Sequence, residues 1–168
     1  MAVKFNLGCG QKPLEGYINC DFNPDIKADR HFDLNVFPYP LDSGSADEVF
    51  MDNVLEHLND VTRVMCELHR ILKPGGMARI KVPYAKSDWA YQDPTHKAFF
   101  TEKSMDYFAE GYAYNYYTRC RFKVVRAELI ADSVSLRHKL RNCIPFRSVL
   151  RFFLFNLYDS IEFELVKV

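Results

Sequence analysis

Short apolar runs and one amphipathic stretch alternate along the first half of the chain. Each run stops at Gly, Asp or Pro, which is typical of a buried strand that enters a turn. Between Leu58 and Leu72 the apolar residues recur at steps of three and four, so this stretch predicts a helix that begins near Asn59 or Asp60 and stops at 74–76. The predicted strands are Val3–Leu7, Tyr17–Asp21, Asp47–Asp52 and Met77–Val82.

The second half of the chain is less regular. Residues 84–118 have no clean period and carry eleven aromatic residues, which indicates either an insertion that acts as a lid over a site or a small satellite core. Beyond them, acidic residues alternate with Ile161, Phe163 and Leu165, a period of two that predicts a closing strand. The predicted elements are a short helix at Glu102–Phe108 capped by Thr101, a strand at Arg121–Ala131, a helix at Ser135–Asp159 broken at Pro145, and a strand at Ile161–Val168.

This order of elements predicts an α/β fold. We expect one domain over residues 1–168, built on a single Rossmann-like open twisted sheet that is mostly parallel with an antiparallel last strand. The chain runs from Gly8 at the end of the first strand to Tyr17 at the start of the second in ten residues, both counted, whereas a parallel crossover normally needs about a dozen or more. The first crossover is therefore expected to be shortened. Ligands of such sheets bind at the carboxyl ends of the strands.

The composition excludes several classes of protein. With 48% hydrophobic and 26% charged residues, the 168-residue chain is typical of a globular domain rather than of a disordered protein. Its five cysteines contain no C-x-x-C pair, which fits neither a disulfide framework nor a structural zinc site. The first residues are typical of a strand rather than of a signal peptide, and the apolar stretch 152–157 is too short to span a bilayer. We therefore expect a reduced, cytoplasmic chain.

The net charge of zero conceals a partition along the sequence. Residues 1–60 carry 4 basic and 11 acidic side chains, whereas residues 119–151 carry 9 basic and 2 acidic ones. Overall neutrality argues against a protein that coats nucleic acid, but salt-dependent RNA binding through 119–151 stays open. The basic and aromatic residues between Arg137 and Phe155 leave three further alternatives: a helix packed on the sheet, a homodimer face, and peripheral contact with a membrane.

Four polar features stand where the predicted strands end. Gly8-Cys9-Gly10 follows the first strand, where glycines let backbone N–H groups approach a ligand, although a tight turn uses the same residues. Asp21 ends the second strand and could accept both hydroxyl protons of a ribose, or cap a helix. Asp33-Leu34 combines an acceptor for an adenine amino group with an apolar side chain that can cover the ring. Residues 52–58 (DNVLEHL) span a strand end and the entry to a helix.

These features lie in the order that class I S-adenosylmethionine-dependent methyltransferases carry them. The chain resembles that family through Gly8-Cys9-Gly10, Asp21, Asp33-Leu34, the sequence VLEHL at 54–58 and the sequence RILKPGG at 70–76. The resemblance covers residues 3–83 well and residues 84–131 loosely. VLEHL and RILKPGG at this spacing are specific to the family, whereas the glycine loop alone is not.

The resemblance implies a set of contacts to S-adenosylmethionine. Gly8 and Gly10 would line the methionine part of the cofactor, and Asp21 would bind its ribose. Asn53 and Val54 would flank the sulfonium. The implied set is completed by the adenine contacts Asp33 and Leu34 and by Cys9 and Phe22.

Two departures from the family pattern lie in the first loop. The usual acid two positions before the first glycine is Asn6, and the third glycine is replaced by Lys12. Lys12 could pair with the carboxylate of the methionine part or simply be solvated. The short loop is similar to that of a compact methyltransferase type 11 subgroup, and this similarity implies sugars or surface polysaccharides as acceptors.

The segment after the strand 77–82 supplies the candidate catalytic residues. Histidine side chains titrate near neutral pH, so His96 suits a base that takes the proton of an acceptor hydroxyl, and Asp93 could orient it. A structural role for His96 within the aromatic segment is the alternative. His57 is interpreted as structural because it starts a helix. A metal site made of His57, Asp93 and His96 has no ligand spacing behind it, so no metal is expected.

The sequence therefore predicts an S-adenosylmethionine-dependent methyltransferase. Its expected acceptor is a small molecule or a glycan, with a hydroxyl as the methylated group. A non-catalytic or NAD-type nucleotide-binding Rossmann protein and an RNA methyltransferase are the alternatives. Lys12 argues against NAD, because it replaces the glycine that seats the pyrophosphate, and the Gly10–Asp21 spacing is also short.

Overall fold

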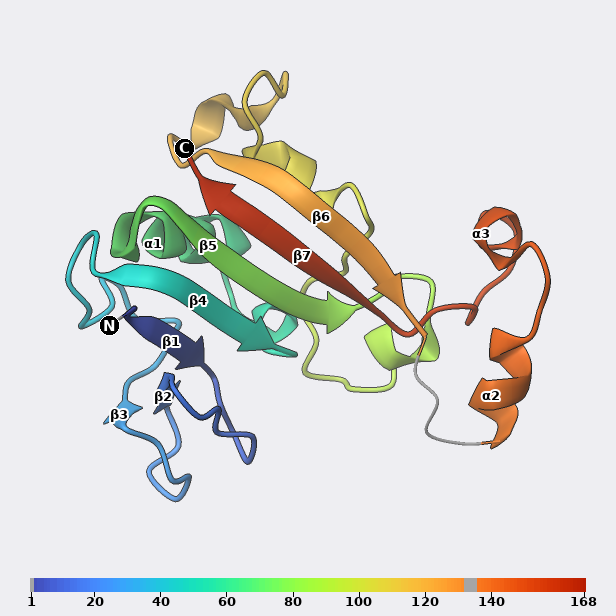
Figure 1. Cartoon of the computed structure of the whole chain (residues 1–168), viewed down its shortest axis with the longest axis horizontal. Coiled ribbons are helices and arrows are strands. Elements are labelled where there is room, and N and C mark those ends of the chain that lie inside the picture. The colour runs from blue at the N-terminus through green and yellow to red at the C-terminus, as the bar shows by residue number, and fades with distance from the viewer. Residues whose placement is uncertain (1, 132–135) are drawn as a thin grey trace.

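The computed structural model of the chain describes residues 2–131 and 136–168 (Figure 1). Its strands are β1 (Lys4–Leu7), β2 (Ile18–Asp21), β3 (Arg30–His31), β4 (Ala46–Asp52), β5 (Leu72–Pro83), β6 (Phe122–Ile130) and β7 (Ser160–Lys167). Its α-helices are α1 (Val61–Ile71), α2 (Leu136–Asn142) and α3 (Arg147–Leu150). Four 3₁₀ turns complete the list: η1 (Leu55–His57), η2 (Asp88–Ala90), η3 (Ser104–Phe108) and η4 (Asn115–Tyr117).

All seven strands form one open sheet in the order β3-β2-β1-β4-β5-β7-β6. The pairs β2–β3, β1–β2, β1–β4 and β4–β5 are parallel, and β7 runs antiparallel to both β5 and β6. The predicted fold class, with its antiparallel last strand, is confirmed. Because β1, β2 and β4 are parallel neighbours, the residues that follow them meet at one edge of the sheet.

The shortened first crossover is confirmed, and Asn19 explains how it holds its shape. Residues 8–17, all of them described, form turns and no helix. The buried Asn19 side chain accepts the Leu14 N–H (2.8 Å) and the Asn6 side-chain N–H (2.9 Å) at its Oδ1. Its amide donates back to the Leu14 carbonyl (3.1 Å). One side chain on β2 thus replaces the backbone bonds that a helix would have supplied.

The predicted amphipathic helix is α1, with tighter limits than its pattern indicates. Asp60 caps its first turn by accepting the Arg63 N–H at 2.9 Å. The helix ends at Ile71 rather than at 74–76, because Leu72 already pairs with Ala46 at the start of β5. Its buried stripe packs into the core of the sheet and consists of Val64, Met65, Leu68 and Ile71.

Predictions in the second half of the chain need correction. The helix expected at 102–108 is the 3₁₀ turn η3, and Thr101 does not cap it: its own N–H donates to Ser104 Oγ at 2.8 Å. The helix expected at 135–159 is limited to α2 and α3, since Pro145 lacks the N–H of a helix interior; its predicted start, Ser135, lies outside the described residues. The two-residue strand β3 was too short and too exposed to leave a pattern.

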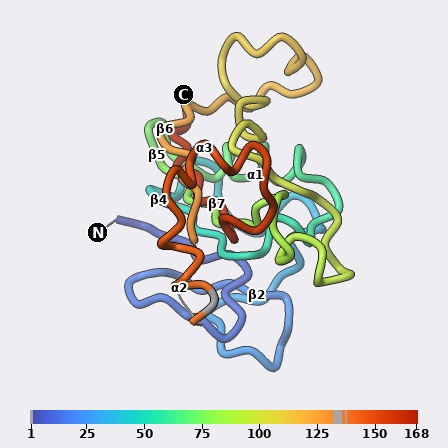
Figure 2. Tube along the Cα trace, turned by 90° about the vertical axis from the view of Figure 1, so that its right-hand side faces the viewer, coloured from blue at the N-terminus to red at the C-terminus, as the bar shows by residue number. Residues whose placement is uncertain are grey.

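The helices α2 and α3 project beyond the end of the sheet where β6 stops and β7 begins (Figures 1 and 2). Large apolar side chains on this projection are exposed, most of all Phe146 at 80% and Phe153 at 82%. This part of the chain therefore does not pack on the sheet as an ordinary helix. Among the described residues, none of the helices combines the length and the apolar character that a bilayer crossing requires.

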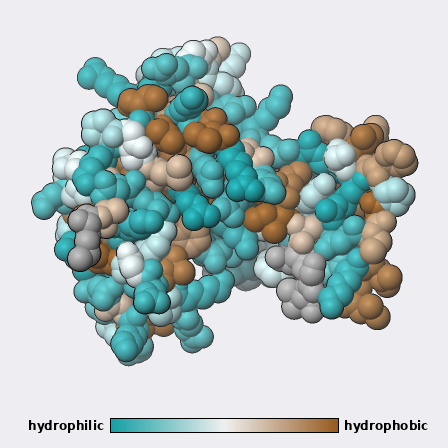
Figure 3. All heavy atoms as spheres, in the orientation of Figure 1, coloured by the Kyte–Doolittle hydropathy of each residue, from teal (hydrophilic) through white to brown (hydrophobic). Residues whose placement is uncertain are grey.

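The two faces of the sheet differ in what covers them. Alternate residues of the central strands, such as Val49 and Ile80, are buried in one core with α1, which lies behind the sheet in Figure 1. The opposite face of the described strands carries no helix and is largely hydrophilic (Figure 3). Cross-strand ion pairs join charged side chains there, for example Lys4 with Glu48 (2.8 Å) and Arg79 with Glu162 (2.9 Å).

Candidate functional site

A cavity of about 420 Å³ lies where β1, β2 and β4 end. Seven of the nine cofactor residues predicted from the sequence line it: Gly8, Asp21, Phe22, Asp33, Leu34, Asn53 and Val54. Cys9 and Gly10 are next to the cavity in the chain but do not line it. The remaining lining residues are Asn35, His57, Leu58, Thr95 and Lys97. Residues from five separate segments therefore converge on one hollow at the expected edge of the sheet.

Gly8 forms the turn that opens this cavity. Its φ of +70° is a left-handed conformation that suits glycine, and a Cβ there would lie 2.6 Å from Val54 Cγ2. The N–H groups of Gly8 and Cys9 both donate to the Cys20 carbonyl, at 2.8 and 3.0 Å. The chain can therefore turn sharply off β1 while Val54 approaches its backbone closely.

The acidic side chains are placed for the polar parts of a nucleoside. Asp21 is buried, and its carboxylate accepts the N–H of Gly10 (2.8 Å) and of Asn23 (3.0 Å). Those two bonds orient the carboxylate, which keeps further lone pairs for the hydroxyls of a ribose. Asp33 is exposed beside the buried Leu34 and accepts the Asn35 N–H at 2.8 Å. The acceptors, the apolar cover and the close turn at Gly8 all fit S-adenosylmethionine.

Asn53 lines the cavity at the end of β4, and Lys12 pairs with the neighbouring residue Asp52. Asn53 has a φ of 55°, a conformation that asparagine tolerates better than most residues, and its N–H donates to the Lys81 carbonyl at 2.9 Å. Lys12 Nζ pairs with Asp52 Oδ2 at 3.0 Å. The lysine that replaces the third glycine thus closes the short first loop onto the end of β4.

A polar corner borders the cavity at His57 and Thr95. Thr95 Oγ1 donates to Asp93 Oδ1 (2.7 Å) and lies 2.9 Å from His57 Nδ1. Because the threonine hydroxyl has one proton and gives it to Asp93, Nδ1 of His57 must be the protonated nitrogen of its ring. The Nε2 of His57 therefore carries a lone pair. Hydrogen bonds from Thr95 also lower the pKa of Asp93, and burial together with the nearby His96 lowers the pKa of His57.

His96 packs edge-on against His57, with 4.7 Å between the ring centroids. Its Nδ1 lies 3.0 Å from the Ala90 carbonyl, which can only accept, so this nitrogen carries a proton and Nε2 is the ring nitrogen left for another partner. Asp93 Oδ2 is 3.9 Å from His96 Nε2. The hydrogen bonds of Asp93 thus go to Thr95, and through it order His57, while a backbone carbonyl orders His96.

Glu56 is a buried residue, next to the site, that the sequence analysis did not select. Its side chain is 1% exposed, and neither carboxylate oxygen has a hydrogen-bond partner among the described residues. Burial raises its pKa to about 7, with smaller contributions from Asp52 and Asp93. Its backbone carbonyl accepts the N–H groups of Lys97 (2.7 Å) and Ala98 (3.2 Å), which holds the loop 93–98 against η1. A charged residue inside the apolar run VLEHL is the signal that could have indicated it.

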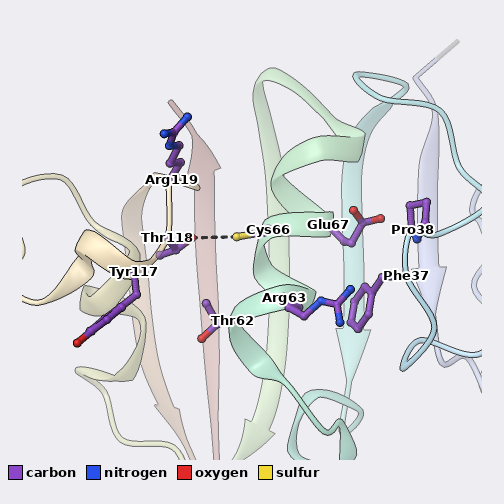
Figure 4. A pocket seen from close by; sticks show the side chains of 9 residues that line it. All are labelled: Phe37, Pro38, Thr62, Arg63, Cys66, Glu67, Tyr117, Thr118 and Arg119. Atoms are coloured by element: carbon purple, nitrogen blue, oxygen red, sulfur yellow. Dashed lines mark hydrogen bonds between the residues drawn. The ribbon is translucent and has the colours of Figure 1, made fainter.

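A second cavity, of about 480 Å³, lies on the helical side of the sheet (Figure 4). It is bordered by Phe37 and Pro38, by α1, and by residues 117–119. Cys66 faces Thr118 across it, with Sγ and Oγ1 2.9 Å apart. None of the site residues predicted from the sequence lines this cavity, so the candidate site is the one at the strand ends.

Comparison with known proteins gives one family match and a group of similar structures. Residues 19–80, which hold Asp21, Asp33, Asn53 and the VLEHL run, match the family model described as a methyltransferase domain. No curated protein matches the chain significantly.

Solved structures with the same fold span almost the whole chain. An S-adenosylmethionine-dependent methyltransferase from Archaeoglobus fulgidus is 20% identical, with a TM-score of 0.67 over 99% of this chain and 86% of its own. A protein from Haloferax volcanii, solved in complex with the Trm112 methyltransferase activator, is 16% identical, with a TM-score of 0.65 over 98% and 82%. A methyltransferase from Thermotoga maritima, described as a possible histamine N-methyltransferase, is 16% identical, with a TM-score of 0.66 over 100% of this chain and 83% of its own. At these identities the likenesses establish the fold.

The strand order, the cavity at the strand ends and the family match over residues 19–80 together support one class of protein, the class I methyltransferases, whose methyl donor is S-adenosylmethionine. Lys12 argues against the NAD-type alternative, because it replaces the glycine that seats the pyrophosphate.

Proposed function

We propose that the chain is an S-adenosylmethionine-dependent methyltransferase that methylates a hydroxyl group of a small molecule or of a sugar-containing acceptor. One observation carries the proposal. His57 and Thr95 line the cavity at the strand ends, and the ring of His96, which does not itself line the cavity, packs edge-on against His57 at 4.7 Å between centroids. A hydroxyl must lose its proton to become methylated, and this corner supplies groups that can receive one.

The residues of the chain have separate tasks in this reaction. S-adenosylmethionine, when bound, supplies an electrophilic methyl group at its sulfonium. His96 takes the proton of the acceptor hydroxyl at Nε2, while its Nδ1–H stays on the Ala90 carbonyl and fixes the ring. Asp93 acts by positioning: through Thr95 it fixes the ring of His57, which lines the cavity against the acceptor. Alignment of the hydroxyl and removal of its proton are the two contributions that the protein makes.

Exposed rings beside this corner support a sugar as the acceptor. Tyr91 and Phe99 stack on each other with 4.8 Å between centroids, and both are about half exposed. They flank the loop from which Thr95 and Lys97 line the cavity. Aromatic faces of this kind pack against the C–H faces of sugar rings while the sugar hydroxyls stay free to react.

A labelled-methyl assay over a panel of free sugars, nucleotide sugars and small phenols tests the proposal. We expect transfer to at least one hydroxyl acceptor, and a fall in kcat of about 10²–10⁴-fold for His96→Ala. Calorimetry with S-adenosylhomocysteine serves as the control and should give the same affinity for His96→Ala as for the parent. Product labelled only on nitrogen, or no loss of kcat in His96→Ala, would contradict the proposal.

A further inference from the structure

We infer that Glu56, His57 and His96 form a binding site for a divalent transition-metal cation beside the cofactor cavity. A ligand atom from each of the three side chains lies within 4.8 Å of the other two. Two of them adjoin one another in η1, and the third comes from the loop after β5, about forty residues later in the chain. The inference deepens the proposed function and rests on it for the acceptor, although cation binding itself can be measured without any acceptor.

The hydrogen bonds of the cluster leave several of its atoms without a partner, which favours a bound cation. The Nδ1 protons of His57 and His96 are directed away from the cluster, to Thr95 and to the Ala90 carbonyl. Each ring then has only its Nε2 left for a further partner, and the two carboxylate oxygens of Glu56 are buried without a donor among the described residues. Buried acceptors without partners destabilise a fold, and both oxygens of Glu56 are in that position. A single cation satisfies all three side chains at once.

A proton is the competing occupant, and it fits the cluster less well. A proton on Glu56 could be donated to only one of the two Nε2 atoms, so the second would still lack a partner. A metal ion has no such restriction, because it accepts electron pairs from several directions. The number and direction of the lone pairs therefore favour the cation.

The surroundings of the two histidines are those of metal ligands. Ligating histidines generally donate their second N–H to a carbonyl, or reach a carboxylate, and these bonds fix the tautomer that ligates. His96 does so to Ala90, and His57 does so through Thr95 to Asp93. Sequence reasoning placed Asp93 among possible ligands; in the structure Asp93 supports a ligand, and the buried Glu56 takes the ligand position.

The ligand set indicates which ions fit and what the ion would do. Two imidazoles and one carboxylate suit Zn²⁺, Mn²⁺, Fe²⁺ or Co²⁺ better than Mg²⁺ or Ca²⁺, which prefer oxygen ligands, and three protein ligands leave positions open for a substrate. An acceptor hydroxyl on the ion loses its proton to solvent more readily, and its oxygen then bonds to the methyl carbon while the sulfur keeps the electron pair of the broken C–S bond. His96 would in that case act as a ligand instead of as the base.

Titration of chelator-treated, full-length protein with Zn²⁺ and with Co²⁺ tests the site. We expect one ion per chain by calorimetry, and visible absorption bands from Co²⁺ with nitrogen ligands. Glu56→Gln and His96→Ala should each weaken binding at least 10-fold, and Thr95→Val by about 10–100-fold because it releases His57. His31→Ala, an exposed histidine of β3, is the matched control and should bind as the parent does.

The outcomes separate the inference from the proposed function. Absence of stoichiometric binding, or binding that Glu56→Gln and His96→Ala leave unchanged in folded protein, would overturn the metal site. Full methyl transfer by metal-free enzyme would overturn the part given to the ion in the reaction, while leaving the proposed function intact with His96 as the base. Metal binding that is lost in the variants, in a protein that labels no hydroxyl acceptor, would support the site and contradict the proposed function.

Discussion

At the scale of single residues, the close approach of Val54 to Gly8 shapes the cavity at the strand ends. Gly8 is at a left-handed φ, and any side chain there would meet the methyl groups of Val54. The sequence indicates that a glycine follows β1, because a strand that stops at G-x-G requires a turn. It does not indicate which side chain the turn approaches, since Val54 lies more than forty residues away in the chain.

We expect Gly8→Ala to abolish cofactor binding, because its Cβ would lie 2.6 and 2.8 Å from the two methyl groups of Val54. Calorimetry with S-adenosylhomocysteine is the measurement. Gly16→Ala is the matched control: Gly16 has a φ of +79°, so the substitution costs similar backbone strain, but nothing lies within 4 Å of the added Cβ. Equal affinities in the two variants would show that strain, and not the contact with Val54, determines the outcome.

At the scale of elements, Glu67 joins α1 to the segment that leads into β4. Its carboxylate accepts the Tyr39 N–H (2.8 Å) and two hydrogen bonds from Arg70 (2.7 and 2.9 Å). Arg70 in turn donates to the carbonyls of Tyr39 and Leu41. The amphipathic pattern predicts α1 but not this connection, because Glu67 lies on the polar side of the pattern.

This connection should make stability sensitive to acid. Burial by itself would raise the pKa of Glu67, but the hydrogen bonds from Arg70 and Tyr39 outweigh it and lower the pKa below its ordinary value. The unfolded state therefore binds the proton more tightly. The stabilisation is complete at neutral pH, begins to fall below about pH 5, and is lost as the pH drops through the folded pKa.

Denaturant unfolding between pH 7 and pH 3 measures this effect. Glu67→Gln should start from a lower free energy of unfolding at pH 7 and should then lose less of it on acidification than the parent does. An identical acid dependence in the parent and in Glu67→Gln would show that other carboxyl groups are responsible.

At the scale of the whole molecule, one face of the sheet carries ion pairs where a doubly wound α/β fold carries a second layer of helices. Parallel strands are normally apolar on both faces, because helices cover both. Here Arg79 on β5 lies at 2.9 Å from Glu162, 3.7 Å from Glu164 and 3.8 Å from Glu48, so it joins three neighbouring strands on the open face. The short first crossover leaves no helix among residues 8–17 to cover them.

We expect Arg79→Ala to lower the free energy of unfolding by about 1 kcal/mol, because it leaves three carboxylates without their shared cation. The loss should shrink in about 1 M salt, where exposed charges are screened. Lys123→Ala, at an exposed lysine of β6 for which the described residues show no ion pair, is the control and should change stability little. A loss for Arg79→Ala that does not depend on salt would indicate a packing role for its side chain instead.

The local pattern of the chain determined most of the elements and their order. The apolar pattern predicts β1, β2, β4 and α1 directly. Burial of one face of an element repeats apolar residues at the period of that element, and this repeat is visible over a few neighbouring residues. The position of Asp21 and Asp33 at the edge of the sheet is also predicted by the order of the elements, since polar residues that end parallel strands meet at one edge.

Only the tertiary structure decided which groups meet across long stretches of chain. The pairing of Glu56 and His57 with His96 depends on how the loop after β5 folds back onto η1, and Asp93 bonds to Thr95 rather than to the ring of His96 for the same reason. The bare face of the sheet likewise appears only once the first crossover is seen to lack its helix. The period of apolar residues shows which face of an element is buried. Contacts between loops that are distant in the chain depend instead on how all the elements pack together.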